Sequence, residues 1–263
     1  NLRADVFGVG EVSFLNINIT KPPFDNPLVR QAIAYAISRD DHVALFNEPV
    51  AEPVYSVVPA QLLPGGLTRE EAEERGVLFE QDIEKAKQLL AEAGYPDGFS
   101  IDLITSEMPT YRRNYEVLQA ELAEIGIQVN LNVVAHATMH EQIRQDVNPI
   151  VIYVAWRPNA DAFLTRFFHS DSIIMTGKAP DTNFSHYDKI DDLIEQARYE
   201  TDPDRQEELW KQANEQVLRD VAAYPLLFTN QVYARSTAVD YGHELVSSLA
   251  LYPQITELTT INR

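Results

Sequence analysis

The sequence predicts an α/β domain built on a mixed, mostly parallel sheet that is flanked by helices. Strand and helix patterns alternate through the middle of the chain, and most helix patterns begin at a residue suited to be an N-cap. Of the 263 residues, 45% are hydrophobic and 23% are charged, which is ordinary for a globular protein. This length can bury a substantial core, and the lack of a flexible linker favours one domain with a helical subdomain.

The N-terminal part of the chain is predicted to form a strand and two helices. Residues 12–19 (VSFLNINI) alternate between apolar and polar side chains, which indicates a half-buried strand. Asn26 is expected to be the N-cap of a helix over 27–38, with a proline at its first position. A Pro-rich connection at 48–66 then leads to a short, solvated acidic helix (TREEAEERG).

The middle of the chain repeats strand and helix patterns. They are a helix capped by Asp82, a strand at 99–105, a helix at 110–125, a strand at 127–135, a short helix around 138–146 and a strand at 150–156. The strand, helix and strand from 99 to 135 form a β-α-β unit, which predicts parallel strands joined by a right-handed crossover. We expect the strand at 150–156 to follow a second crossover of the same kind.

The C-terminal part is predicted to be mainly helical and to close with strands. In order, the patterns indicate a short helix (ADAFLTRFFH), a polar loop, two long helices at 188–200 and 203–220, strands at 224–229 and 231–236, and an apolar alternation near 245–252.

Charge and residue usage exclude several classes of function. The formal net charge of −19 would repel phosphate backbones and anionic lipid, which argues against a nucleic-acid or peripheral membrane partner. No apolar run approaches the roughly 20 residues that span a bilayer. The chain has no cysteine, so disulfides, thiolate nucleophiles and Cys-based metal sites are excluded.

Catalytic and cofactor motifs are also missing, and we expect neither a cofactor nor a metal. There is no GxSxG, Walker A or GxGxxG sequence. His136 and His140 are four residues apart on an expected helix, but Ala137 stands where a zinc peptidase needs its glutamate. With 40 acidic residues, a carboxylate pair for hydrolysis of small glycans or peptides remains an alternative of low specificity.

The stretch YVAWRPNADAF carries the strongest local signal for a binding site. An apolar strand delivers Trp156, Arg157, Asn159 and Asp161 onto a loop at its carboxyl end, where ligands bind in open α/β sheets. The indole offers a flat apolar wall, and the charged side chains can orient a solute. The structural alternative is a core tryptophan followed by a local Arg157–Asp161 ion pair.

Four stretches together resemble the bacterial extracellular solute-binding proteins of family 5, which serve peptide, nickel and opine ABC importers. They are FLNINITKPPFDNPLVRQAIAYAIS, DIEKAKQLLAEAGYPDGF, LQAELAEIGIQVNL and YDKIDDLIEQARYETDPDRQEELWKQANEQVLRDVAAYPLL. Their order and spacing match across nearly the whole chain.

The resemblance implies that residues 1–263 are the C-terminal ligand-binding lobe of a two-lobed protein, with a periplasmic-binding-protein-like fold of class II. Family members are longer and carry an N-terminal lobe before these stretches. Segments near 1–14 and 250–263 would then be hinge or lobe-crossing segments. The resemblance also implies a periplasmic or extracellular location, with an export signal or lipid anchor upstream.

The resemblance further implies where a ligand binds, with one departure. Peptide-binding members place an aspartate three residues after the tryptophan to hold the peptide ammonium, but here that position is Asn159. Asp161 could replace it, or the solute is neutral, sugar-like, or anionic through Arg157. A second wall is expected after the strand at 99–105, from Glu107, Tyr111 and Arg112, although an exposed first helical turn is the structural alternative for the last two.

We therefore expect a receptor rather than an enzyme. It would capture a small solute or peptide between two lobes by hinge closure and deliver it to ABC permease subunits, acting as a monomer when full length. The rival is the hydrolase with a carboxylate pair.

Overall fold

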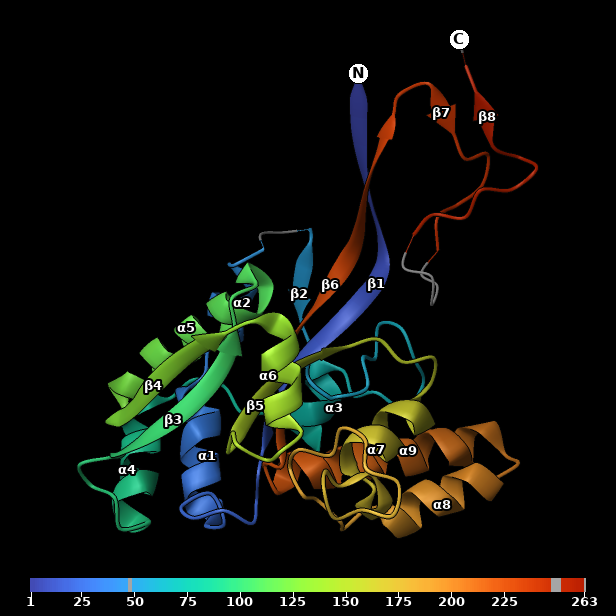
Figure 1. The fold of residues 1–263 in the computed structure, drawn as a ribbon. Coiled ribbons are helices and arrows are strands. Elements are labelled where there is room, and N and C mark those ends of the chain that lie inside the picture. The colour runs from blue at the N-terminus through green and yellow to red at the C-terminus, as the bar shows by residue number, and fades with distance from the viewer. Residues whose placement is uncertain (47–48, 247–251, 263) are drawn as a thin grey trace.

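The computed structural model describes residues 1–46, 49–246 and 252–262, and its central feature is a four-stranded antiparallel sheet (Figure 1). The strands lie in the order β2-β6-β1-β5. Their bounds are Leu2–Ile17 for β1, Ala51–Pro53 for β2, Ile150–Ala155 for β5 and Ala223–Ser236 for β6. The two strands predicted at 224–229 and 231–236 are thus one continuous strand.

Both faces of this sheet are covered, because neighbouring residues of β1 enter different parts of the core. Phe14 packs against α7 (Ala160–Phe168), with its ring 4.9 Å from that of Phe167. Leu15 belongs instead to a cluster with α1 (Pro27–Ala36), α4 (Ile83–Glu92) and α5 (Pro109–Glu124). The strand predicted at 12–19 is confirmed as the end of β1, but the prediction that it is half-buried is wrong, since Ser13 and Asn16 are buried as well.

The predicted β-α-β unit is confirmed. β3 (Phe99–Ser106) and β4 (Ile127–Val134) pair in parallel, from Phe99 opposite Ile127 to Ser106 opposite Val134. The connecting α5 buries Leu118 and Leu122 against them. Local apolar periodicity was sufficient to predict this unit because its two strands are joined directly by one helix and are close in the chain, with Phe99 opposite Ile127.

The second crossover is wrong, and so is the mostly parallel sheet. After α6 (His136–Ile143), β5 joins β1 in antiparallel pairing, from Ile17 opposite Ile150 to Val12 opposite Ala155. The eight-residue α6 packs its buried Met139 beside Val151 instead of crossing a sheet to a parallel neighbour. Among the named strands of the described residues, parallel pairing is confined to β3 and β4, so the fold is α/β with a mixed strand arrangement.

Two helices, α1 and α4, begin where the sequence predicts, because their caps are local. Asn26 Oδ1 accepts a hydrogen bond from the Leu28 N–H at 3.0 Å, and Asp82 Oδ1 accepts one from the Lys85 N–H at 2.9 Å. The remaining helices are α2 (Arg39–Val43), α3 (Arg69–Glu74), α8 (Asp191–Tyr199), α9 (Pro203–Arg219) and a 3₁₀ turn at Ser170–Ser172. In the described part of the chain, none of the helices is long and apolar enough to cross a membrane.

A two-stranded ribbon of β1 and β6 projects beyond the body, and both chain ends lie near its far end (Figure 1). A short pair, β7 (Val239–Asp240) and β8 (Thr260–Ile261), stands beside it. Apolar side chains of the ribbon and of the short pair are exposed, including Leu2 of β1 at 79% and Ile261 of β8 at 74%. The alternation predicted near 245–252 falls mostly on residues 247–251, outside the described residues.

Candidate functional site

The end of β5 and three neighbouring elements bring together aromatic and ionisable side chains. Val12 of β1 pairs with Ala155, the last residue of β5, so Glu11 lies beside the loop that Trp156 begins. α5 contributes one tyrosine from its first turn, and α6 contributes two histidines. We call this group the strand-end cluster: Glu11, Tyr111, His136, His140, Tyr153 and Arg157, with Trp156 next to it in the chain.

Four rings of the cluster contact one another. The Tyr111 ring centroid lies 5.1 Å from that of His136 and 6.0 Å from that of His140. The two histidine rings are 4.6 Å apart, and His140 is 6.0 Å from Tyr153. The rings form a continuous aromatic surface, which is the kind of wall that small-molecule sites use. The described residues contain no group of three or more His, Asp or Glu placed to hold a metal ion.

Burial disfavours the charged form of several groups in this cluster, which shifts their pKa values. It raises the pKa of Tyr111 to about 12, and the nearby Glu11 adds to this effect. Burial also raises the pKa of Glu11 above its ordinary value. It lowers the pKa of His140, and repulsion from His136 and Arg144 lowers it further. The surface therefore presents a neutral phenol and a neutral imidazole, both able to hydrogen-bond a polar solute.

Tyr153 is the centre of the cluster and is held from several sides. Its ring lies 5.6 Å from Phe167 of α7 and 5.3 Å from Phe184. Its hydroxyl accepts a hydrogen bond from Arg144 Nη2 at 3.3 Å. Packing against two large buried rings fixes the orientation of the tyrosine, so it is a rigid part of the wall.

Trp156 and Arg157 carry hydrogen-bond donors that have no partner. Trp156 is half-buried, and its Nε1–H is enclosed without an acceptor in the described residues. Arg157 donates from Nη1 to the Trp156 carbonyl at 2.8 Å, and its guanidinium carbon lies 5.2 Å from the Phe167 ring centroid. Its Nε–H is likewise enclosed without an acceptor. Such donors are rare in folded proteins and need an explanation.

Asn159 and Asp161 have structural partners. Asn159 caps α7, since its Oδ1 accepts from the Ala162 N–H at 2.8 Å. Asp161 forms an ion pair with Arg198 at 2.9 Å, so the local Arg157–Asp161 pair is not formed. Both side chains border a hollow of about 420 Å³ against α9. Their partners are not members of the strand-end cluster, and their binding role stays a prediction.

The three binding residues predicted after β3 lie in different surroundings. Tyr111 joins the strand-end cluster. Glu107 is exposed, and its backbone N–H donates to the Val134 carbonyl at 2.9 Å, which extends the β3–β4 pairing. Arg112 is exposed and pairs with Glu116 at 3.1 Å, as the exposed-helix alternative predicts. The binding roles of Glu107 and Arg112 also stay predictions.

Sequence reasoning missed Glu11 and Tyr153 as candidates and considered the two histidines only as metal ligands. Glu11 reaches the site through the pairing of β1 with β5, which joins residues 133 to 143 positions apart. Tyr153 is surrounded by apolar residues in IVIYVAW, which favours a core position. One available signal was strand alternation. Side chains four residues apart in a strand point to the same side of the sheet, so Tyr153 is on the same side of β5 as Arg157.

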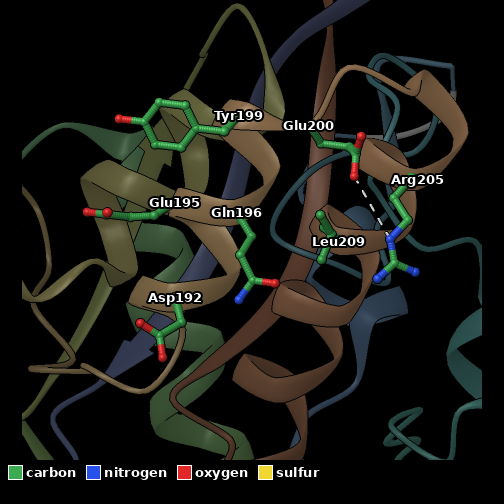
Figure 2. Close-up of a pocket in the computed structure, with 7 residues that line it drawn as sticks. All are labelled: Asp192, Glu195, Gln196, Tyr199, Glu200, Arg205 and Leu209. Atoms are coloured by element: carbon green, nitrogen blue, oxygen red, sulfur yellow. Dashed lines mark ion pairs between the residues drawn. The ribbon is translucent and has the colours of Figure 1, made fainter.

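A second hollow lies between α8 and α9 (Figure 2), and none of the strand-end cluster lines it. Its volume is about 430 Å³. Acidic side chains surround it, and Arg205 reaches Glu200 at 4.0 Å. Tyr199 on its rim is 85% exposed. This hollow is a polar surface depression without a converging set of binding groups.

Comparison with known proteins adds an independent line of evidence. The family model described as bacterial extracellular solute-binding proteins, family 5, middle, matches residues 4–174. The glutathione-binding protein GsiB of Escherichia coli strain K12 is 28% identical over 231 residues, which is 85% of this chain and 43% of that protein.

Solved structures agree with this match along the whole chain. The protein MoaA of A. tumefaciens R10, in complex with mannopinic acid, has a TM-score of 0.87 and 38% identity, with 100% of this chain and 52% of that one covered. DppA of Helicobacter pylori, in complex with the peptide STSA, has a TM-score of 0.83 and 26% identity, with 100% and 49% covered. The chain thus spans about half the length of these relatives.

Proposed function

Because the chain belongs to the bacterial extracellular solute-binding proteins of family 5, we propose that it is the C-terminal ligand-binding lobe of an ABC-importer receptor. The observation that supports this best is the strand-end cluster: a rigid aromatic wall, with unpartnered donors, at the end of a strand. A solute held against this wall would be covered from the other side by a second lobe. Residues near 1–14 and 250–263 would then connect the two lobes.

The cluster suits binding better than hydrolysis. A carboxylate-pair hydrolase needs two acidic groups flanking the scissile bond. Within the strand-end cluster Glu11 is the one carboxylate, and Asp161 nearby along the chain is engaged by Arg198. The aromatic wall supplies stacking and hydrogen bonding without a nucleophile activated by a base. We therefore propose a receptor that performs no chemistry.

The location and partners follow from the same proposal. GsiB is named as a glutathione-binding protein, and MoaA and DppA were solved with mannopinic acid and a peptide. We propose that this receptor also takes a small solute, in the periplasm or at the cell surface, with or without a lipid anchor. Permease subunits would receive the solute from a monomeric full-length receptor. The neutral Asn159 and its cap contact argue against a clamp for a peptide ammonium at that position.

Trp156→Ala in the full-length protein tests this proposal. The solute is first identified by native mass spectrometry of protein purified gently from its host, and its affinity is then measured by calorimetry. Loss of a stacking wall should weaken binding about tenfold or more, which corresponds to about 1.4 kcal/mol for each factor of ten.

Trp210→Phe is the matched control, because Trp210 is buried in the core formed with α7 and α9. This variant should keep the affinity of the parent protein. A folded Trp156→Ala protein with unchanged affinity would refute the placement of the site.

A further inference from the structure

Arg144 connects the C-terminal end of α6 to the aromatic wall. Its Nη1 donates to the His140 carbonyl at 3.0 Å and lies 3.4 Å from His140 Nδ1. Its Nη2 donates to the Tyr153 hydroxyl at 3.3 Å. One exposed guanidinium thus holds an imidazole of α6 and the phenol of β5 together.

The chemistry of these groups determines where their protons lie. A guanidinium can only donate, so His140 Nδ1 must accept, and the ring proton of His140 must be on Nε2. For the same reason the Tyr153 hydroxyl accepts from Arg144, and its own proton points away from the arginine. The contact therefore requires a neutral His140, and it leaves one N–H and one O–H of the wall as donors for a solute.

The surroundings of His140 disfavour a second proton on its ring. Burial lowers the pKa of His140, and repulsion from His136, with the two ring centroids 4.6 Å apart, and from Arg144 lowers it further. The titratable and charged groups around this part of the wall are His136 and Arg144 of α6, Tyr111 of α5, Tyr153 of β5, Glu11 of β1, and Arg157 with Asp181 beyond the end of β5. The two acids of this set act on other groups, Glu11 on Tyr111 and Asp181 on Arg157.

Protonation of His140 is incompatible with the arginine contact. It places an N–H on Nδ1, opposite the N–H of Arg144 Nη1, so two donors and two positive charges face each other. We propose that His140, Arg144 and Tyr153 form a proton-sensitive latch: a proton taken up from solvent at His140 Nδ1 displaces Arg144 from both rings and weakens binding of the solute at the wall. This inference rests on the proposed receptor function and adds regulation of the same site by pH.

The direction of the pH dependence follows from linkage. The solute-bound form keeps His140 neutral, so affinity is complete above about pH 6.5, the ordinary pKa of histidine. Because the pKa of His140 is lowered from 6.5, affinity falls only as the pH decreases through that lower value. One excluded proton weakens binding by at most about tenfold for each further pH unit.

Nitrogen-15 NMR of the histidine rings in the 263-residue chain tests the latch without a solute. At about pH 7.5 His140 should be the Nε2–H tautomer, and the ring signals of Tyr153 should shift with the same midpoint as His140 on acidification. Arg144→Gln should raise the pKa of His140, because it removes a positive charge. An Nδ1–H tautomer in the parent chain, or Tyr153 signals that do not follow His140, overturns the latch.

Calorimetry of the full-length protein tests the effect on binding with three probes: mannopinic acid, glutathione and the peptide STSA. A probe that binds should do so about tenfold more weakly at about pH 5 than at about pH 7.5. His140→Gln should remove this dependence, because an amide oxygen can accept from Arg144 but does not titrate. Glu11→Gln should keep the dependence, which separates the latch from titration of that carboxyl group.

His243→Gln is the matched control, because the ring nitrogens of His243 face the backbone carbonyls of Glu244 and Gln254. It should keep the pH dependence of the parent protein, and the thermal unfolding midpoint of each variant shows whether it is folded. Equal affinity at both pH values, or a dependence that survives in His140→Gln, overturns the inference but leaves the receptor function intact. Failure of all three probes to bind at either pH counts against the receptor function, while the NMR result still decides whether the latch exists.

Discussion

Gly98→Ala should separate β3 from β4 at the point where the two strands begin. Gly98 has φ +73°, and a Cβ there would lie 2.0 Å from the Gly126 carbonyl oxygen. Gly94 has φ +93° but nothing within 4 Å of its Cβ position. Both substitutions force an L-residue into the left-handed region, at about 1–2 kcal/mol. Only Gly98→Ala also makes the new methyl group clash with the backbone. Overpacking of this kind typically costs about 1–3 kcal/mol in addition.

Urea unfolding of the chain, followed by circular dichroism, measures the free energy of unfolding of both variants. We expect Gly94→Ala to lose about 1–2 kcal/mol and Gly98→Ala about 2–5 kcal/mol. Equal losses in the two variants would mean that the backbones of Gly98 and Gly126 are not in contact, and the paired starts of β3 and β4 would have to be abandoned.

Two further predictions concern buried polar groups. Glu121→Ala should lower the free energy of unfolding by about 3 kcal/mol, because Glu121 Oε2 lies 3.3 Å from Nε2 of the fully buried His42; a double-mutant cycle with His42→Ala that gives coupling below about 0.5 kcal/mol would contradict this pairing. Burial raises the pKa of Asp146, but hydrogen bonds from His186 and Lys21 outweigh it and hold that pKa below the ordinary 3.8. Its stabilising contribution is therefore complete above that value and is lost as the pH falls through the folded-state pKa. Urea titrations from about pH 5 to about pH 2 should show a shallower acid loss in Asp146→Asn, and an unchanged slope would refute the role of this carboxylate.

The sequence predicts those parts of the fold whose causes are local. The caps at Asn26 and Asp82 and the parallel β3–α5–β4 unit each depend on residues that are close in the chain. The partner of β5 depends on β1, from the other end of the matched region, and periodicity carries no information on such a pairing. An apolar run after a helix is compatible with either a parallel or an antiparallel neighbour.

The same difference between local patterns and distant pairings applies to the candidate site. Trp156 and Arg157 were found because a polar loop directly follows an apolar strand, which is a local pattern. Glu11 was not, because it reaches the loop only through the register of β1. His136 and His140 were weighed only as metal ligands, whereas their contacts with Tyr111 make them part of an aromatic wall.

Where this protein leaves polar groups unsatisfied is itself informative. Some buried groups that serve the fold have partners: Asn214 donates to the Gly65 carbonyl at 2.8 Å, and the Tyr115 hydroxyl accepts from the Ile152 N–H at 2.9 Å. Several enclosed polar atoms of the described residues have none, among them Asn16 Oδ1, Thr105 Oγ1 and Gln231 Nε2. The unpartnered donors of Trp156 and Arg157 differ from these in standing in consecutive residues at the end of a strand. Folding alone would favour an acceptor there, because an enclosed donor without one costs about 1–3 kcal/mol. Proteins accept such local departures from good packing at functional sites, which agrees with the proposed site at the end of β5.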